Sequence, residues 1–145
     1  MDKKKILFMC TGNSCRSQMA EGWARHFLGQ EFESFSAGSV KHGLDQRAVQ
    51  VMSEAGVDIS EQTSKTIDEL PDMDFDVVIT LCDSAHESCP FFPGQVKRIH
   101  QGFDDPPGLV QGTAAEESRL QDYRRVRDEI RDFVLELPYK LRADI

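Results

Sequence analysis

The sequence has no long apolar run, no surplus of positive charge and no Cys-x2-Cys pair. No apolar stretch approaches the roughly 20 residues that a membrane-spanning helix needs. The formal net charge of −8 argues against general binding to nucleic acid. The apolar stretch after the basic start of the chain is far too short for a signal peptide. We therefore expect a cytoplasmic monomer that binds neither membrane nor nucleic acid.

The lack of a Cys-x2-Cys pair bears on what the 4 cysteines do. In a cytoplasmic chain, cysteines are more often catalytic or metal-binding than structural. Cys82, His86 and Cys89 could in principle ligate a metal, but their spacing matches no standard zinc pattern and no fourth ligand is evident. We therefore expect no metal site. No histidine falls into a Cys–His catalytic pattern either.

Strand and helix patterns alternate along the chain of 145 residues, without repeats or linkers. The expected strands cover 6–9, 32–36, 76–81 and 96–99. The expected helices follow the first strand up to Gly29, cover 46–55 and 64–70, and end the chain after a capping pattern at 113–116. This predicts one α/β domain, residues 1–145, with a four-stranded, parallel, doubly wound sheet and helices on both faces.

The spacing of apolar residues predicts which helix faces are buried. Asp45 is the expected cap of the second helix, and Gly56 its end. The expected inward-facing residues are Met19, Ala20, Trp23, Ala24, Phe27 and Leu28 in the first helix, Ala48, Val49, Met52 and Ala55 in the second, and Leu120, Tyr123, Val126, Ile130, Phe133, Val134 and Leu137 in the last.

The stretch from Cys10 to Ser17 joins the first strand to the first helix and carries the expected chemistry. Gly12 and Asn13 tolerate the left-handed backbone that a tight turn needs. Successive N–H groups can then form an anion-binding nest, which the helix dipole reinforces. Arg16 supplies a planar fork of donors for a tetrahedral oxyanion. A cysteine beside such a nest is expected to be a thiolate, and Ser17 can donate to its sulfur or cap the helix.

This Cys-x5-Arg-Ser stretch resembles the phosphate loop of the low-molecular-weight protein tyrosine phosphatases. The longer string over residues 10–22 resembles the thioredoxin-coupled arsenate reductases that share that fold. The resemblance extends over nearly the whole chain, through residues 36–38, 56–60, 80–82, 89–90, 102–106 and 125–130.

The resemblance implies a substrate site and a general acid. The substrate-binding residues it implies are Thr11, Gly12, Asn13, Ser14, Cys15, Arg16 and Ser17. In the family, the aspartate immediately before a proline protonates the leaving oxygen, which maps onto Asp105 rather than Asp104. Cys15 has no separate redox role in the pattern and is expected to serve as a loop residue.

Cys82 and Cys89 decide between the functions that this loop could serve. Cys82 follows the third strand, so it belongs at the same sheet edge as Cys10. Reduction of arsenate needs two electrons, which thiols can supply by forming a disulfide. The resemblance implies a relay in which Cys10 attacks arsenic, Cys82 attacks Cys10, and Cys89 attacks Cys82. Thioredoxin would then reduce the Cys82–Cys89 disulfide, and no cofactor is expected. A phosphatase acting on phosphotyrosine or other phosphomonoesters, and a non-enzymatic arsenic- or redox-sensing module, remain alternatives.

A further expectation concerns the segment between Cys82 and Cys89. Cys82 and Cys89 would lie about 10 Å apart along a regular helix, whereas a disulfide needs Cα atoms roughly 4.4–6.8 Å apart. We therefore expect residues 82–92 to adopt different arrangements in the reduced and oxidised protein.

At the place of Lys65, some relatives carry an acidic residue that helps to hold potassium behind the phosphate loop. The lysine ammonium could occupy that place itself, or it could point to solvent.

Overall fold

The computed structural model describes residues 3–71, 74–83, 95–109 and 115–142. Their strands are β1 (Lys4–Cys10), β2 (Phe32–Gly38), β3 (Val77–Thr80) and β4 (Lys97–His100). The helices are α1 (Arg16–Leu28), α2 (Gln46–Glu54), α4 (Pro106–Leu109) and α5 (Glu116–Arg142), with a 3-10 turn, η1, at Ile67–Glu69. The expected strands are therefore all present, within a few residues of their predicted bounds.

The strands form one parallel sheet in the order β2-β1-β3-β4. The chain leaves β1 toward one edge of the sheet and then returns to its other side to form β3. The carboxyl ends of β1 and β3 therefore meet at the point where the strand order reverses, which is where open α/β sheets bind ligands. The predicted parallel, doubly wound fold is confirmed.

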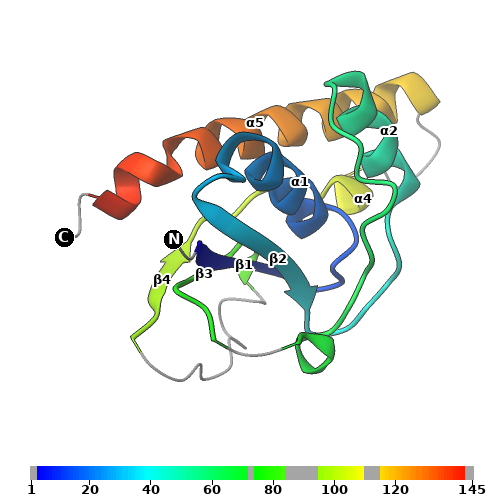
Figure 1. Ribbon diagram of the computed structural model, residues 1–145. Coiled ribbons are helices and arrows are strands. Elements are labelled where there is room, and N and C mark those ends of the chain that lie inside the picture. Colours follow the sequence, from blue (N-terminus) through cyan, green and yellow to red (C-terminus); the bar gives the residue numbers. More distant parts are fainter. Residues whose placement is uncertain (1–2, 72–73, 84–94, 110–114, 143–145) are drawn as a thin grey trace.

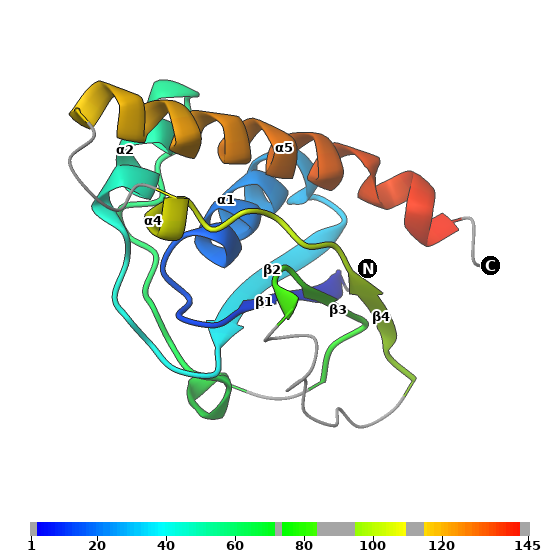
Figure 2. The same cartoon turned by 180° about the vertical axis from the view of Figure 1, so that it is seen from behind.

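The two faces of the sheet bury different residues because side chains alternate along a strand. Ile6 and Phe8 of β1 pack in the larger core with α1 and α5. Leu7 and Met9 pack in a smaller cluster that includes Leu70 after η1. Figures 1 and 2 show α1, α2 and α5 together on one side of the sheet, with η1 on the other.

Helix α1 buries its predicted stripe with one exception. Trp23 is buried, and its indole Nε1 donates to the carbonyl of Arg127 in α5 at 3.1 Å. Phe27 was expected to face inward, but this is wrong, because the side chain is 41% exposed. Its ring instead stacks on Trp23, with centroids 5.4 Å apart. One helical turn beyond Trp23, Phe27 thus covers the edge of the core rather than filling it.

Helix α2 begins and ends as its capping residues predicted. The side chain of Asp45 accepts a hydrogen bond from the N–H of Arg47 at 2.9 Å. Gly56 has a φ of 87°, a left-handed conformation that favours glycine. The expectation that Ala55 faces inward is wrong, since it is exposed beyond the last helical turn, and Val51 is buried in the helix instead.

The expected helix over residues 64–70 is wrong, because only η1 forms there. The backbone before η1 is held in an extended form by contacts with β2 and the loop after β1. Gly38 donates to the carbonyl of Lys65 at 3.0 Å, and Thr66 forms an isolated parallel bridge with Gly38. These tertiary bonds outweigh the local helical pattern, and helical turns begin only at the capping box of Thr66 and Glu69.

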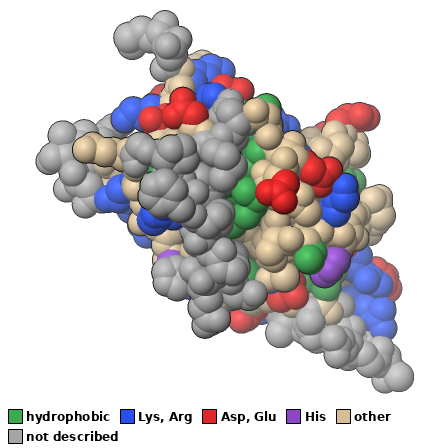
Figure 3. All heavy atoms as spheres, turned by 90° about the horizontal axis from the view of Figure 1, so that it is seen from below, with side chains coloured by type: hydrophobic (Ala, Val, Ile, Leu, Met, Phe, Trp, Pro, Cys, Tyr) green, Lys and Arg blue, Asp and Glu red, His purple; other side chains and the backbone are tan. Residues whose placement is uncertain are grey.

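Helix α5 covers the sheet with all 7 of its predicted core residues buried. The predicted cap at 113–116 lies largely outside the described residues. Among the helices of the described ranges, none combines the length and apolar character needed to cross a membrane. The face of the molecule away from α5 carries a small group of hydrophobic side chains near its centre, with acidic and basic side chains around it (Figure 3).

Candidate active site

The carbonyl groups of the loop between β1 and α1 are all bound by donors from other segments or from α1. The donors are the backbone N–H groups of Val40, His42, Asp45 and Met19 for the carbonyls of Thr11, Gly12, Ser14 and Cys15, and the side-chain amide of Gln18 for the carbonyl of Asn13. Every bond measures 2.9 to 3.1 Å. The loop is therefore held from outside along its whole length.

The N–H groups of the same loop point the other way. A trans peptide is planar, so a carbonyl that points out of the loop directs the next N–H into it. From Gly12 to Cys15 these N–H groups bind no acceptor within the described part of the chain. Of these residues, Gly12, Ser14 and Cys15 line a hollow of about 260 Å³ at the N-terminus of α1. This is the nest that the sequence predicted, and it favours a small oxyanion.

Gly12 and Asn13 shape the nest for different reasons. Asn13 adopts the left-handed conformation with a φ of 47°, as predicted, and is fully buried. At Gly12, a Cβ would lie 2.5 Å from Nδ1 of His42, so this residue is needed for close approach rather than for an unusual φ. His42 lines the hollow and is a residue that the sequence did not single out, because its own loop lies far along the chain.

Cys10 lies at the end of β1 with its sulfur beside the loop. Its Sγ is 2.9 Å from the hydroxyl of Ser17. The side-chain amide of Asn13 in turn donates to that hydroxyl at 2.8 Å. With its oxygen bound by Asn13, the Ser17 hydroxyl can direct its proton at the Cys10 sulfur. Cys10 and Cys15 are both buried free thiols.

Arg16 and Asp105 lie together at the mouth of the nest. Arg16 Nη1 donates to the carbonyl of Phe103 at 3.0 Å, and its Nη2 lies 3.7 Å from Asp105 Oδ1. Asp105 lines the hollow, and its side chain is 49% exposed, so it can exchange protons with water. Asp104 instead pairs with Arg125 of α5 at 3.0 Å, which leaves Asp105 as the acid that faces the nest.

Cys82 reaches the same sheet edge from β3. Its Sγ is 3.3 Å from the hydroxyl of Thr11, the first residue of the loop. Cys82 and Cys10 belong to the same buried cluster. The structure therefore brings Cys82 to the nest, while Cys89 and most of segment 82–92 lie outside the described residues. No group of three His, Cys, Asp or Glu suited to a metal occurs in the described ranges.

Cys15 is the N-cap residue of α1 and lines the hollow, as a loop residue should. Burial raises the pKa of its thiol well above the usual range, and the nearby carboxylates of Asp45 and Asp105 act in the same direction. A neutral thiol is a poor nucleophile, so Cys15 differs in reactivity from a thiol that is held as the anion.

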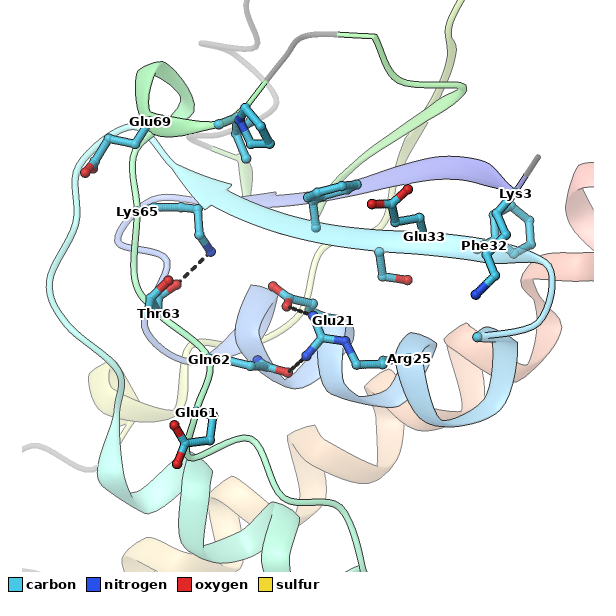
Figure 4. A pocket seen from close by; sticks show the side chains of 15 residues that line it. Lys3, Glu21, Arg25, Phe32, Glu33, Glu61, Gln62, Thr63, Lys65 and Glu69 are labelled. Carbon is cyan, nitrogen blue, oxygen red and sulfur yellow. Dashed lines mark hydrogen bonds and ion pairs between the residues drawn. The ribbon is translucent and has the colours of Figure 1, made fainter.

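A buried polar network lies directly behind the loop. Lys65 donates its backbone N–H to Asn13 Oδ1 at 2.8 Å, and its ammonium donates to the carbonyl of Thr63 at 2.7 Å and to that of Ser36 at 3.3 Å. Figure 4 shows this ammonium directed toward Thr63 rather than away from the protein. A cation is thus already present at these carbonyls, so the residues do not fit a bound potassium ion.

Glu21 and Gln18 complete this network from α1, and neither residue was predicted from the sequence. Glu21 is buried, accepts a hydrogen bond from Ser36 at 2.5 Å and pairs with Arg25 (Figure 4). Gln18 is fully buried and donates to Asn13 Oδ1 at 3.0 Å. Their positions in the helix could have indicated this role. Both lie beside the apolar stripe of α1, where a buried polar residue needs a hydrogen-bond partner.

The fold and this loop define a class of protein in which a cysteine lies beside an oxyanion nest at the edge of a parallel α/β sheet. Residues 5–144 match the family model "Low molecular weight phosphotyrosine protein phosphatase". The chain belongs to this family.

Relatives within this family point to a narrower group. The chain is 57% identical over 132 residues to an arsenate reductase of Bacillus licheniformis, covering 90% of this chain and 91% of the relative. A solved structure described as an arsenate reductase in the oxidized state superposes with a TM-score of 0.78 at 34% identity, covering 94% of this chain and 98% of the other. A thioredoxin-dependent arsenate reductase of Corynebacterium glutamicum gives a TM-score of 0.69 at 25% identity, covering 99% of this chain and 64% of the other.

Proposed function

We propose that this protein is a thioredoxin-coupled arsenate reductase. One observation carries the proposal: a second thiol, Cys82, lies at the rim of the nest that holds Cys10, with its sulfur 3.3 Å from the Thr11 hydroxyl. Hydrolysis of a phosphate ester needs one nucleophile and water, and it has no use for a second thiol. Reduction of an oxyanion needs two electrons, which two thiols provide when they form a disulfide.

The first step uses the nest as it stands. The N–H groups of the loop and the guanidinium of Arg16 bind arsenate and stabilise the charge that develops on its oxygens. The Cys10 thiolate attacks arsenic and forms an S–As bond. Asp105 protonates the departing oxygen, which leaves as water. The hydroxyl of Ser17 holds the sulfur in place for this attack, while Asn13 holds the hydroxyl.

The second step transfers the electrons. The Cys82 thiolate attacks the Cys10 sulfur, so an S–S bond forms as the S–As bond breaks. The electron pair of that bond stays on arsenic, which is reduced from As(V) to As(III) and leaves as arsenite. Cys89 then attacks the Cys82 sulfur, which frees Cys10 and leaves the Cys82–Cys89 disulfide. The dithiol of thioredoxin reduces this disulfide and closes the cycle.

A phosphatase acting on phosphotyrosine or other phosphomonoesters is the second candidate. The same nest, Cys10 and Asp105 suffice for hydrolysis of a phosphomonoester, because phosphate and arsenate share their tetrahedral shape and charge. We expect this activity to be a weak side reaction, since the steps that need Cys82 and Cys89 add nothing to it.

The setting we propose for this chemistry is the cytoplasm. The protein acts as a one-domain monomer, with arsenate as its substrate and thioredoxin as its protein partner. It needs no cofactor, metal, membrane or nucleic acid. Light scattering of the purified protein tests the monomer directly, and a mass close to that of one 16.4 kDa chain is expected.

The test of function is the oxidation of NADPH with thioredoxin and thioredoxin reductase present. Arsenate should start steady NADPH oxidation by the reduced protein, and phosphate should not. Cys10→Ser protein serves as the background control. Arsenate-dependent oxidation no faster than this background, together with rapid hydrolysis of a phosphate ester, would favour the phosphatase instead.

A further inference from the structure

The imidazole of His100 bridges the residues on either side of Leu81 and Cys82. Its Nδ1 lies 2.8 Å from the hydroxyl of Thr80, and its Nε2 lies 3.1 Å from the carboxylate of Asp83. A carboxylate only accepts hydrogen bonds, so Nε2 carries a proton. In the neutral ring, Nδ1 then accepts from the Thr80 hydroxyl. Both nitrogens of His100 are thus engaged with the chain that carries Cys82.

The sheet holds this part of the chain as far as Leu81. The N–H of Leu81 donates to Met9 at 2.9 Å, and its carbonyl accepts from Phe103 at 3.1 Å. Cys82 comes next, where the chain has left the sheet. Asp83 is anchored from the other side by the ring of His100, which stands opposite Thr80 in the β3–β4 register. Cys82 therefore lies between two fixed points.

The exposure of the hydrogen bond between His100 and Asp83 bears on its role. The Asp83 side chain is 90% exposed, and a polar contact so exposed adds little to stability. The bridge does tie Asp83, the residue directly after Cys82, to β4. The sulfur of Cys82 must meet the sulfur of Cys10 in line with the bond that breaks, and small errors in such placement are costly to rate.

We propose that His100 is a positioning residue for Cys82. Through Thr80 and Asp83, it holds the Cys82 thiol against Thr11, ready to attack Cys10. The inference rests on the proposed relay, in which Cys82 is the second nucleophile. His100 takes no part in binding arsenate or in the first attack, because its contacts lie on the β3–β4 side of the sheet edge.

The test compares two activities of the same variants. In His100→Ala and Asp83→Ala, kcat for thioredoxin-coupled arsenate reduction should fall about 5- to 10-fold, while KM for arsenate and the rate of phosphate-ester hydrolysis stay within about twofold. His100→Gln, whose amide can still donate toward Asp83, should recover part of the lost kcat. His26→Ala is the matched control, since His26 is an exposed histidine near the end of α1, and it should behave as wild type.

Each other outcome overturns the inference. An unchanged kcat in His100→Ala would mean that the bridge does not position Cys82. An equal fall in reduction and hydrolysis would mean that His100 supports the whole site rather than one thiol. Cys82→Ser, assayed alongside, separates these results from a failure of the proposed function. If that variant kept multiple-turnover reduction, the relay itself would be wrong, and the inference would fail with it.

Discussion

The two thiols at the sheet edge are held in very different ways. Cys10 lies beside a loop whose carbonyls are all bound, and its sulfur contacts a hydroxyl that is itself fixed by Asn13. Cys82 contacts one loop hydroxyl, that of Thr11, and the chain around it is steadied by the ring of His100. In the proposed relay, Cys10 attacks the bound oxyanion and benefits from rigidity, whereas Cys82 is held for its attack on Cys10 and must then exchange to Cys89. Substitutions at and around the two thiols should therefore have very different effects.

Removing the rigid thiol should abolish both activities. Cys10→Ser replaces the thiolate by a hydroxyl that is not ionised at neutral pH, so neither arsenate nor a phosphate ester is attacked. Thioredoxin-coupled arsenate reduction and phosphate-ester hydrolysis should both fall to background, with the melting temperature as a check on folding. Hydrolysis that persisted in this variant would place the nucleophile elsewhere.

Removing either of the other thiols should separate the two activities. Cys82→Ser and Cys89→Ser should lose multiple-turnover arsenate reduction, because the relay cannot pass its disulfide on to thioredoxin. Both should keep phosphate-ester hydrolysis near the wild-type rate, since only the attack by Cys10 is shared. Correctly folded Cys89→Ser protein that lost hydrolysis would contradict this division of labour.

The two neighbouring aspartates should differ strongly. Asp105→Asn removes the proton donor that faces the nest and should lower hydrolysis by roughly 100-fold or more at its pH optimum. Asp104→Asn removes an exposed ion pair with Arg125, which should change the rate by no more than about twofold. Comparing the two rates over a range of pH values checks the assignment. Similar losses in both variants would show that hydrolysis depends on the structure of this loop rather than on one proton donor.

Cys15 should react slowly although it lies close to Cys10. Its pKa is raised by burial, so folding favours the protonated thiol. Its contribution to stability is therefore complete below the ordinary thiol pKa of about 8.5 and is lost as the pH rises through the higher value in the folded protein. Iodoacetamide at pH 8 should modify Cys10 and spare Cys15 in the native protein, as read by peptide mass spectrometry. Equal labelling of Cys15 in native and unfolded protein would contradict the account.

The smallest expected effect is that of potassium. Because the Lys65 ammonium already binds the carbonyls of Thr63 and Ser36, an added cation cannot bind these carbonyls and stabilise the protein there. Replacing potassium by tetramethylammonium at constant ionic strength should leave activity and melting temperature unchanged. Lys65→Asp, which restores an acidic residue at this place, should make both sensitive to potassium. A large effect on the wild-type protein would be the contrary result.

The loop between β1 and α1 could be predicted from the sequence because the residues that shape it are neighbours in the chain. A strand, a turn with Asn13, and a helix that begins at Arg16 follow one another within a few residues, so each can be read from its neighbours. The network behind the loop could not be predicted in the same way. Gln18, Glu21 and Lys65 meet only after the chain has folded, and nothing in the sequence next to Lys65 shows that its ammonium binds Ser36.

The errors in the predicted fold have the same origin. The pattern at 64–70 is helical in isolation, but bonds from Gly38 and Asn13 keep its first residues extended. Phe27 has helical spacing that suits the core, yet it lies where the core ends and stacks on Trp23 instead. In the first case, partners far along the chain outweigh the local helical preference. In the second, the extent of the folded core decides, and the spacing of apolar residues along one helix does not show where that core ends. The resemblance to the family predicts Asp105, not Asp104, as the proton donor. The ion pair between Asp104 and Arg125 gives a physical reason to prefer Asp105.

The most direct test of the relay is to map the disulfide after a single round of reaction. Fully reduced protein is mixed with excess arsenate in the absence of thioredoxin, free thiols are alkylated, and the linked peptides are identified by mass spectrometry. The account predicts one arsenite released per protein and a disulfide between Cys82 and Cys89, with Cys10 recovered as an alkylated thiol. Arsenite release with a disulfide between any other pair, or no arsenite release at all, would contradict it.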